Sequence, residues 1–239
     1  HHVEVQLLCD QFGHAVTLGE RECSVQRKNQ KLLEESPSPV LSEETREKML
    51  HAARKAAKAV GYQGVGTIEF LYTDDGQFYF MEMNTRLQVE HPVTELVTSV
   101  DLVKWQIRVA AGAKLPFNTH HLALQGHAIE CRINAEDPEH DNRPSCGKVT
   151  VLHVPGGPGV RFDTALYQDY VIPPFYDSMI GKLIVHAPTR EEAIRKMRAA
   201  LGELVVGGVV HNRELQLEIL SNKEFLQGNY HTDLMTHLH

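Results

Sequence analysis

The chain has 239 residues, of which 42% are hydrophobic and 23% charged, so it can form one large globular domain or two smaller ones. Its formal net charge of −7, with basic residues interleaved among acidic ones, argues against a nucleic-acid-binding protein. No apolar run approaches the roughly 20 residues of a membrane span, and the four cysteines form no CxxC pair. We therefore expect a cytoplasmic protein with no membrane or nucleic-acid partner and no disulfide framework.

The predicted elements begin with short strands over residues 3–35 and a helix that Ser42 caps and Gly61 ends. Two strands, 66–72 and 78–84, form a hairpin, and a polar loop follows over 85–91. The remaining predictions are helices at 93–98, 102–111, from Thr189 and at 212–220, and strands at 127–134, 148–154 and 182–186. Without a strict βαβ rhythm, this order predicts an α+β fold with a largely antiparallel sheet. Because the chain enters its first strand with almost no lead-in, we expect a fragment of a longer protein.

The hairpin predicts a metal site. Period-two alternation places Phe78, Phe80, Glu82 and Asn84 on one face, and a four-residue loop would put Glu69 opposite Phe80, diagonal to Glu82. Two carboxylates so close repel, so a cation or a proton must lie between them. Oxygen ligands without thiolate or imidazole favour Mg²⁺ or Mn²⁺, and Mg²⁺ often accompanies nucleotide phosphates. A solvated polar face is the alternative.

The loop that follows this strand is rich in groups that could recognise an anion. Arg86 carries a planar fork that can pair with carboxylate-like oxygens, and Glu90 could act as a general base near it. An ordinary charged loop is the alternative.

Four blocks of this sequence carry a family resemblance. Residues 80–86 resemble the metal-binding strand of ATP-grasp ligases, and their extension to residue 95 resembles the signature of biotin-dependent carboxylases. Residues 20–31, 130–138 and 176–183 are similar to further blocks of that family, in the same order. The resemblance implies the second half of an ATP-grasp domain over 1–116 and a biotin carboxylase C-terminal domain over 117–239. It also implies that the family's amino-terminal Rossmann-like domain and most of its lid are absent.

The resemblance also implies residue roles. Glu69, Glu82 and Asn84 should ligate Mg²⁺ or Mn²⁺ that bridges the ATP phosphates, which agrees with the hairpin argument. Lys31, Arg86 and the backbone of Val89 should hold bicarbonate, and Glu90 should deprotonate it for attack on the γ-phosphate. Arg132 should stabilise the charge that develops on the ureido oxygen of biotin.

His2 and Asn29 should lie near the nucleotide, although Asn29 stands where many relatives have histidine. Two of the implied roles have plainer alternatives. Lys31 could be one more surface lysine of a basic cluster, and Arg132 could form an ordinary cross-strand ion pair with Glu130.

The activity implied is ATP-dependent carboxylation of biotin by bicarbonate, the first half-reaction of acetyl-CoA carboxylase in fatty acid biosynthesis. The implied partners are a biotin carboxyl carrier protein, carboxyltransferase subunits and, in the full-length form, a second copy of the chain. We expect the isolated chain to be inactive because the nucleotide clamp is missing. Alternatives are a pyruvate, propionyl-CoA or methylcrotonyl-CoA carboxylase, or a non-catalytic module that binds a carrier or dimerises.

Overall fold

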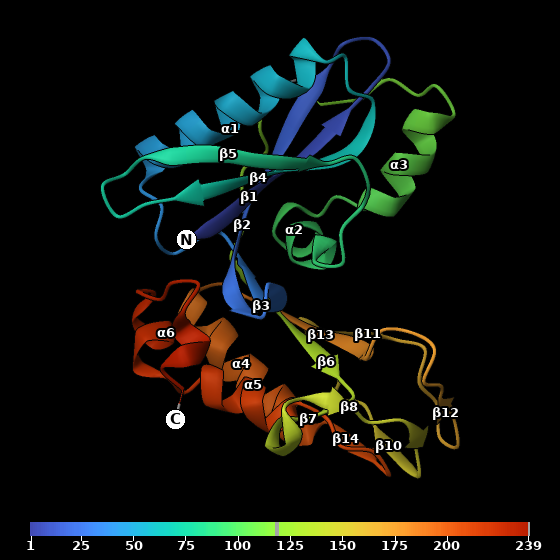
Figure 1. Ribbon diagram of the computed structural model, residues 1–239. Helices are drawn as coiled ribbons and strands as arrows, with labels where there is room; N and C mark the ends of the chain where they lie inside the picture. Colours follow the sequence, from blue (N-terminus) through green and yellow to red (C-terminus); the bar gives the residue numbers. More distant parts are fainter. Residues whose placement is uncertain (118–119, 239) are drawn as a thin grey trace.

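An eight-stranded sheet, in the order β11-β13-β6-β3-β2-β1-β4-β5, runs through both halves of the molecule (Figure 1). The computed structural model describes residues 1–117 and 120–238. The strands of this sheet are β1 His2–Cys9, β2 Ala15–Arg27, β3 Gln30–Ser36, β4 Gly64–Tyr72, β5 Phe78–Asn84, β6 His127–Asn134, β11 Val160–Thr164 and β13 Met179–Ala187. Three small antiparallel pairs complete the strands: β7 Glu136–Asp137 with β8 Arg143–Pro144, β9 Gly147–Lys148 with β12 Val171–Ile172, and β10 Val151–His153 with β14 Val205–Gly207.

The helices cover both faces of the long sheet. They are α1 Glu43–Ala59, α2 His91–Thr98, α3 Leu102–Ala110, α4 Arg190–Glu203, α5 Arg213–Ile219 and α6 Lys223–Gln227, with single 3₁₀ turns at Pro138–His140 and Leu234–Thr236. Helix α1 packs on β1 and β2, and α4 packs on β13 and β6, whereas α2 lies on the opposite face (Figure 1). In the described residues, no helix is long and apolar enough to cross a membrane.

Strand β6 shows how alternation assigns the two faces. Ile129, Cys131 and Ile133 are buried in the apolar cluster that contains the residues of α4. The residues between them face α2, and they include Glu130 and Arg132. Because side chains alternate along a strand, one face of β6 builds the core and the other carries polar side chains.

The α+β fold with an antiparallel sheet is confirmed, since every strand pairing within the described ranges is antiparallel apart from one isolated bridge, Thr17 to His121. The predicted helix after Ser42 and the strand at 127–134 are present. The strand predicted over 148–154 is wrong as a single element. The chain changes partner there, because Val149 N–H donates to Tyr170 and Thr150 N–H donates to Gly207, which divides the segment into β9 and β10.

The strands predicted over 3–35 are longer than expected, and β2 alone has 13 residues. Helix α6, which Asn222 caps through hydrogen bonds to two backbone N–H groups, was not predicted. Val60 lies at the C-cap of α1, after the last helical turn, and is 71% exposed.

Candidate active site

The β4–β5 hairpin contains a β-bulge that determines which side chains converge. Phe70 pairs with Phe80, but the residue before it in β4, Glu69, pairs with Glu82, so Met81 is an extra residue in β5. The prediction that Glu69 lies opposite Phe80 is therefore wrong. Directly paired residues point to the same face, so the bulge brings Glu82 onto the face of Glu69.

The predicted common face of Phe78, Phe80, Glu82 and Asn84 is wrong for the same reason. Phe78 lies on the α1 side of the sheet, where its ring meets Phe70 edge-on with centroids 5.4 Å apart. Glu82 and Asn84 point to the other face, because the bulge shifts the alternation by one residue. The two carboxylates thus converge as predicted, but because of a β-bulge that the alternation argument did not include.

Glu69, Glu82 and Asn84 form a compact group of oxygen-bearing side chains. Asn84 Nδ2 lies 2.9 Å from Glu69 Oε1 and 3.4 Å from Glu82 Oε1. Two carboxylates and one carboxamide suit a hard divalent cation such as Mg²⁺ or Mn²⁺. To ligate it, the amide of Asn84 would turn so that Oδ1, which here accepts from Arg86, faces the ion.

Glu69 is the buried member of this group and is held ionised. Its Oε2 lies 2.6 Å from His2 Nε2, and its Oε1 accepts from Gln88 at 2.8 Å and from Lys31 at 3.3 Å. Burial raises the pKa of Glu69, but the contact with His2 and the charge of Lys31 outweigh it and leave the pKa at about 2. A carboxylate that is ionised throughout the physiological range is what a metal ligand requires.

Lys31 is not a surface lysine. Its Nζ donates to Glu4 at 2.7 Å and to Glu90 at 2.6 Å, besides the longer bond to Glu69, and its side chain is only 13% exposed. The lysine thus joins the metal-ligand group to the residue that the sequence predicts as the base.

Glu90 is held between two cations. Its Oε1 accepts from Lys31 at 2.6 Å, and its Oε2 accepts from Arg132 Nη2 at 3.1 Å. Arg132 Nε also donates to Glu34 Oε1 at 2.7 Å. The alternative that pairs Arg132 with Glu130 is therefore wrong, because β3 places Glu34 within its reach instead.

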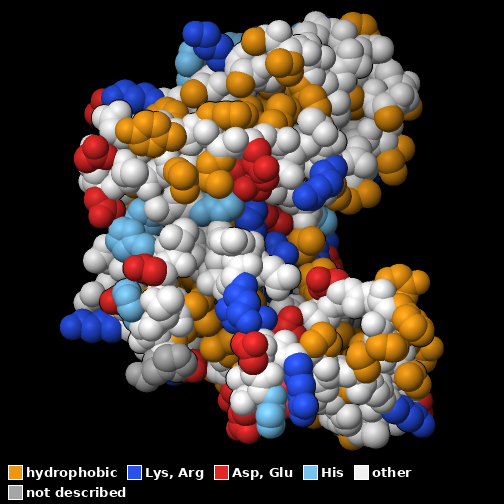
Figure 2. Space-filling view, in the orientation of Figure 1, with side chains coloured by type: hydrophobic (Ala, Val, Ile, Leu, Met, Phe, Trp, Pro, Cys, Tyr) orange, Lys and Arg blue, Asp and Glu red, His pale blue; other side chains and the backbone are white. Residues whose placement is uncertain are grey.

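All ten residues predicted for the site line one cavity of about 500 Å³. They are His2, Asn29, Lys31, Glu69, Glu82, Asn84, Arg86, Val89, Glu90 and Arg132. Asn134, Asp177, Ser178 and Met179 from the other half of the chain line it as well. Figure 2 shows acidic, basic and histidine side chains close together across the middle of one face.

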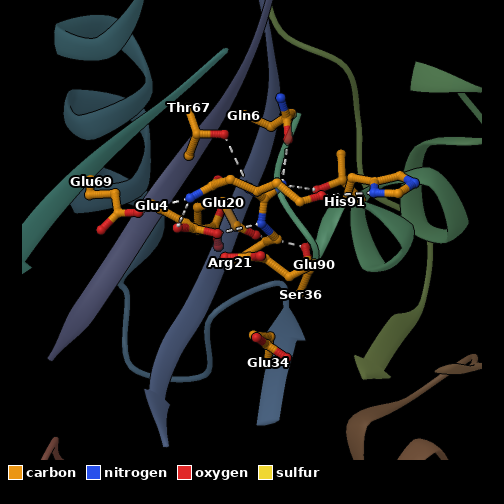
Figure 3. A network of polar contacts seen from close by, with 12 residues as sticks. Glu4, Gln6, Glu20, Arg21, Glu34, Ser36, Thr67, Glu69, Glu90 and His91 are labelled. Atoms are coloured by element: carbon orange, nitrogen blue, oxygen red, sulfur yellow. Dashed lines mark hydrogen bonds and ion pairs between the residues drawn. The ribbon is translucent and has the colours of Figure 1, made fainter. Parts of the chain in front are cut away.

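Arg21 supports the site from behind, a role that was not predicted. All five of its N–H groups are used, and Figure 3 shows Glu4, Gln6 and Thr67 around it. The acceptors are Glu4 at 2.6 Å, Gln6 at 2.6 Å, Thr94 at 2.9 Å, Gln88 at 2.8 Å and Thr67 at 3.3 Å. In the sequence Arg21 lies between two glutamates and resembles an exposed charge. The strand register that pairs Arg21 with Glu4 is the feature that would have indicated this supporting role.

Lys182 was also missed, because the sequence placed it only in a strand. Its Nζ donates to the carbonyl of Val89 at 2.6 Å and so fixes the loop that carries Val89 and Glu90.

Comparison with known proteins assigns both parts of the chain. Residues 1–118 match the family described as carbamoyl-phosphate synthase L chain, ATP binding domain, and residues 130–237 match the family described as biotin carboxylase C-terminal domain. A protein named biotin carboxylase from Nostoc sp. is 56% identical over 234 residues, which cover 98% of this chain and 52% of that protein. A pyruvate carboxylase subunit from Methanothermobacter thermautotrophicus is 53% identical over 231 residues, covering 97% of this chain and 47% of the relative.

Solved structures agree with these relatives. The biotin carboxylase domain dimer of Hydrogenobacter thermophilus 2-oxoglutarate carboxylase, solved with MgADP and bicarbonate, matches with a TM-score of 0.96 at 47% identity, covering 99% of this chain and 52% of that one. Biotin carboxylase from Campylobacter jejuni, solved as a beta-gamma-ATP complex, matches with a TM-score of 0.95 at 48% identity and the same coverage. The chain spans about half the length of the curated relatives that it matches.

Proposed function

This chain belongs to the biotin carboxylase family, and we propose that it forms the metal, bicarbonate and biotin side of an enzyme that carboxylates biotin at the expense of ATP. The observation that carries the proposal is the position of Glu90, whose two oxygens meet Lys31 and Arg132 beside the Glu69, Glu82 and Asn84 group. We place the boundary between the ATP-grasp part and the C-terminal domain after residue 116.

Bicarbonate would bind where positive charge and N–H donors face the cavity. Lys31, Arg86 and the backbone N–H of Val89 line that region, and Glu90 lies beside them. Glu90 would take the bicarbonate proton, so that the oxyanion attacks the γ-phosphorus of ATP to give carboxyphosphate and ADP. A divalent ion held by Glu69, Glu82 and Asn84 would neutralise charge on the phosphate oxygens.

Biotin would bind on the side of Arg132. Carboxyphosphate breaks into CO₂ and phosphate, the phosphate takes the proton from biotin N1, and N1 then attacks CO₂. The charge that develops on the ureido oxygen would be stabilised by Arg132, whose guanidinium faces the same cavity as Glu90. We propose that His2 and Asn29, which line the same cavity, contact the nucleotide.

For the complete enzyme we propose the biotin carboxylase component of an acetyl-CoA carboxylase of the cytoplasm. Its substrate would be biotin on a carrier protein, its product would pass to carboxyltransferase subunits, and it would act as a homodimer. Pyruvate carboxylase is the second candidate, because the relative with that name is nearly as similar as the biotin carboxylases. A non-catalytic module is less favoured, since Lys31, Arg86 and Glu90 all line the cavity.

The test is ATP hydrolysis that depends on both biotin and bicarbonate. We expect negligible turnover from the 239-residue chain and substantial turnover from a protein extended to the length of its relatives. In the extended protein, Glu90→Gln should lower kcat by about 100- to 10,000-fold, because it removes the base. The control is Glu44→Gln on the exposed side of α1. Near-normal turnover by the short chain, or by the Glu90→Gln variant, would contradict the proposal.

A further inference from the structure

Two buried glutamates on neighbouring strands face each other beside Arg132. Glu34 on β3 and Glu130 on β6 are direct partners in the strand register, and both are 0% exposed. Direct partners on one face of an antiparallel pair have Cβ atoms about 5 Å apart. Both oxygens of Glu130, and Oε2 of Glu34, have no hydrogen-bond partner among the described residues.

The neighbouring cations contact groups other than Glu130. Arg132 donates to Glu34 Oε1 and to Glu90 Oε2. Lys182 donates to the carbonyl of Val89, and its nearest carboxylate is Asp163 at 3.8 Å. Within residues 1–117 and 120–238, no ion pair includes Glu130.

Two ionised carboxylates cannot be buried side by side with only one cation between them. The cost of an unpaired buried carboxylate exceeds that of keeping its proton, so such a pair retains one. Arg132 contacts Glu34 directly, so the negative charge belongs on Glu34 and the proton on Glu130.

We propose that Glu130 is a positioning residue that stays protonated at neutral pH and donates a hydrogen bond to the free oxygen of Glu34. Glu34 thereby remains the charged acceptor that orients Arg132 toward biotin. The role in catalysis rests on the proposed function, whereas the shared proton does not. The charged groups that face Glu130 are Glu34, Lys182, Arg132 and Glu90.

The charge distribution supports this assignment. Burial raises the pKa of Glu130 well above its ordinary value, and the charge of Glu34 raises it further. Burial also raises the pKa of Glu34, but the adjacent Arg132 opposes that rise. The proton therefore favours Glu130 over Glu34.

This arrangement would also explain the orientation of the Arg132 guanidinium. Nε donates to Glu34, Nη2 contacts both Glu34 and Glu90, and the hydrogen bonds of the described residues include none from Nη1. A guanidinium held at two points of its planar fork presents its remaining N–H groups in a fixed direction. A neutral partner next to Glu34 keeps that support without adding a second negative charge.

The first test is infrared spectroscopy of the 239-residue chain in D₂O at neutral pH, which separates carboxylic acid from carboxylate stretches. We expect Glu130→Gln to remove one carboxylic acid band and the exposed control Glu44→Gln to remove none. A Glu130→Gln spectrum with every acid band still present would overturn the proposal. Neither ATP nor biotin is needed, so a failure of the proposed function would leave this result unaffected.

The second test follows the Nε–H NMR signal of Arg132, assigned by its loss in Arg132→Lys. Glu130→Gln retains a donor for Glu34 and should leave the signal and its hydrogen exchange unchanged. Glu130→Leu removes the donor and should shift the signal and speed its exchange by about tenfold or more. Unchanged exchange in Glu130→Leu would overturn the proposal. If Glu130→Leu fails to fold, Glu34→Gln takes its place, and the proposal again requires a shifted signal.

Discussion

Replacing Arg21 with methionine should strongly destabilise the part of the fold that carries the site. Arg21 is 0% exposed and joins residues of β1, β4 and α2 to the loop of Gln88 through five hydrogen bonds. Methionine fills part of the volume but donates nothing, so it leaves the carboxylate of Glu4 buried without its main partner.

The expected cost follows from the contacts that remain. Removing one partner of a buried ion pair costs about 3–5 kcal/mol, because an uncompensated charge stays behind. Glu4 would keep Lys31, 2.7 Å away, which favours the lower end, about 3 kcal/mol. Burial raises the pKa of Glu4, but Arg21 and Lys31 outweigh it and lower the pKa to about 2, so this carboxylate is charged at neutral pH and needs both cations.

The assay is urea unfolding at neutral pH, followed by circular dichroism and by the fluorescence of Trp105, the single tryptophan. The double variant Arg21→Met with Glu4→Gln should regain about half of the lost free energy of unfolding, because it removes the stranded charge. Lys48→Met, which removes a cation from an exposed pair, is the control and should change little. An Arg21→Met variant within about 1 kcal/mol of the parent, or a double variant no better than the single one, would refute this reasoning.

Two further predictions concern pH dependence and the metal group. Glu35 is 0% exposed and accepts hydrogen bonds from Arg190. Burial raises the pKa of Glu35, but His127 and Arg190 outweigh burial and lower this pKa to about 2 from the ordinary 4.5. The ionised Glu35 therefore stabilises the fold by about 3 kcal/mol above pH 4.5, and this contribution is lost as pH falls through 2. Acid unfolding of Glu35→Gln should lack this component. Deleting Met81 removes the extra residue but keeps Glu82 opposite Glu69 by regular alternation from Phe80, so Mn²⁺ binding in an electron paramagnetic resonance titration should stay within about tenfold of the parent. Glu82→Gln, which removes a proposed ligand, should weaken Mn²⁺ binding by at least about tenfold.

The sequence predicted most elements because their periodicity reflects burial. Strand 127–134 and the capped helix after Ser42 were found because alternation and helical spacing are local properties. The convergence of Glu69 and Glu82 was also predicted, but with a register error of one residue that the bulge at Met81 offset. No composition signal marks that extra residue, since a bulge is defined by its partner strand.

Long-range polar contacts could not be predicted in this way. The pair of Arg21 with Glu4, and the pair of Glu34 with Glu130, depend on strand registers between segments that are distant in sequence. Each of these glutamates, seen alone in a strand, has the appearance of a solvated charge. Only the assembled sheet shows that they are covered on both sides.

The uninterrupted sheet has a mechanical consequence for the proposed reaction. Glu69 on β4, Lys31 on β3 and Arg132 on β6 belong to strands of one hydrogen-bonded ladder, so the spacing between the phosphate end and the biotin end is built into the backbone. In residues 1–117 and 120–238 the ladder runs from β4 to β6 through β1, β2 and β3, so the two ends can open or close relative to each other only by distorting these pairings, among them the β3–β6 pairing at residues 33–36. The substrates therefore bind to groups whose spacing is set by the sheet. A substitution that loosens this pairing would alter the distance between the two ends without changing any reacting group.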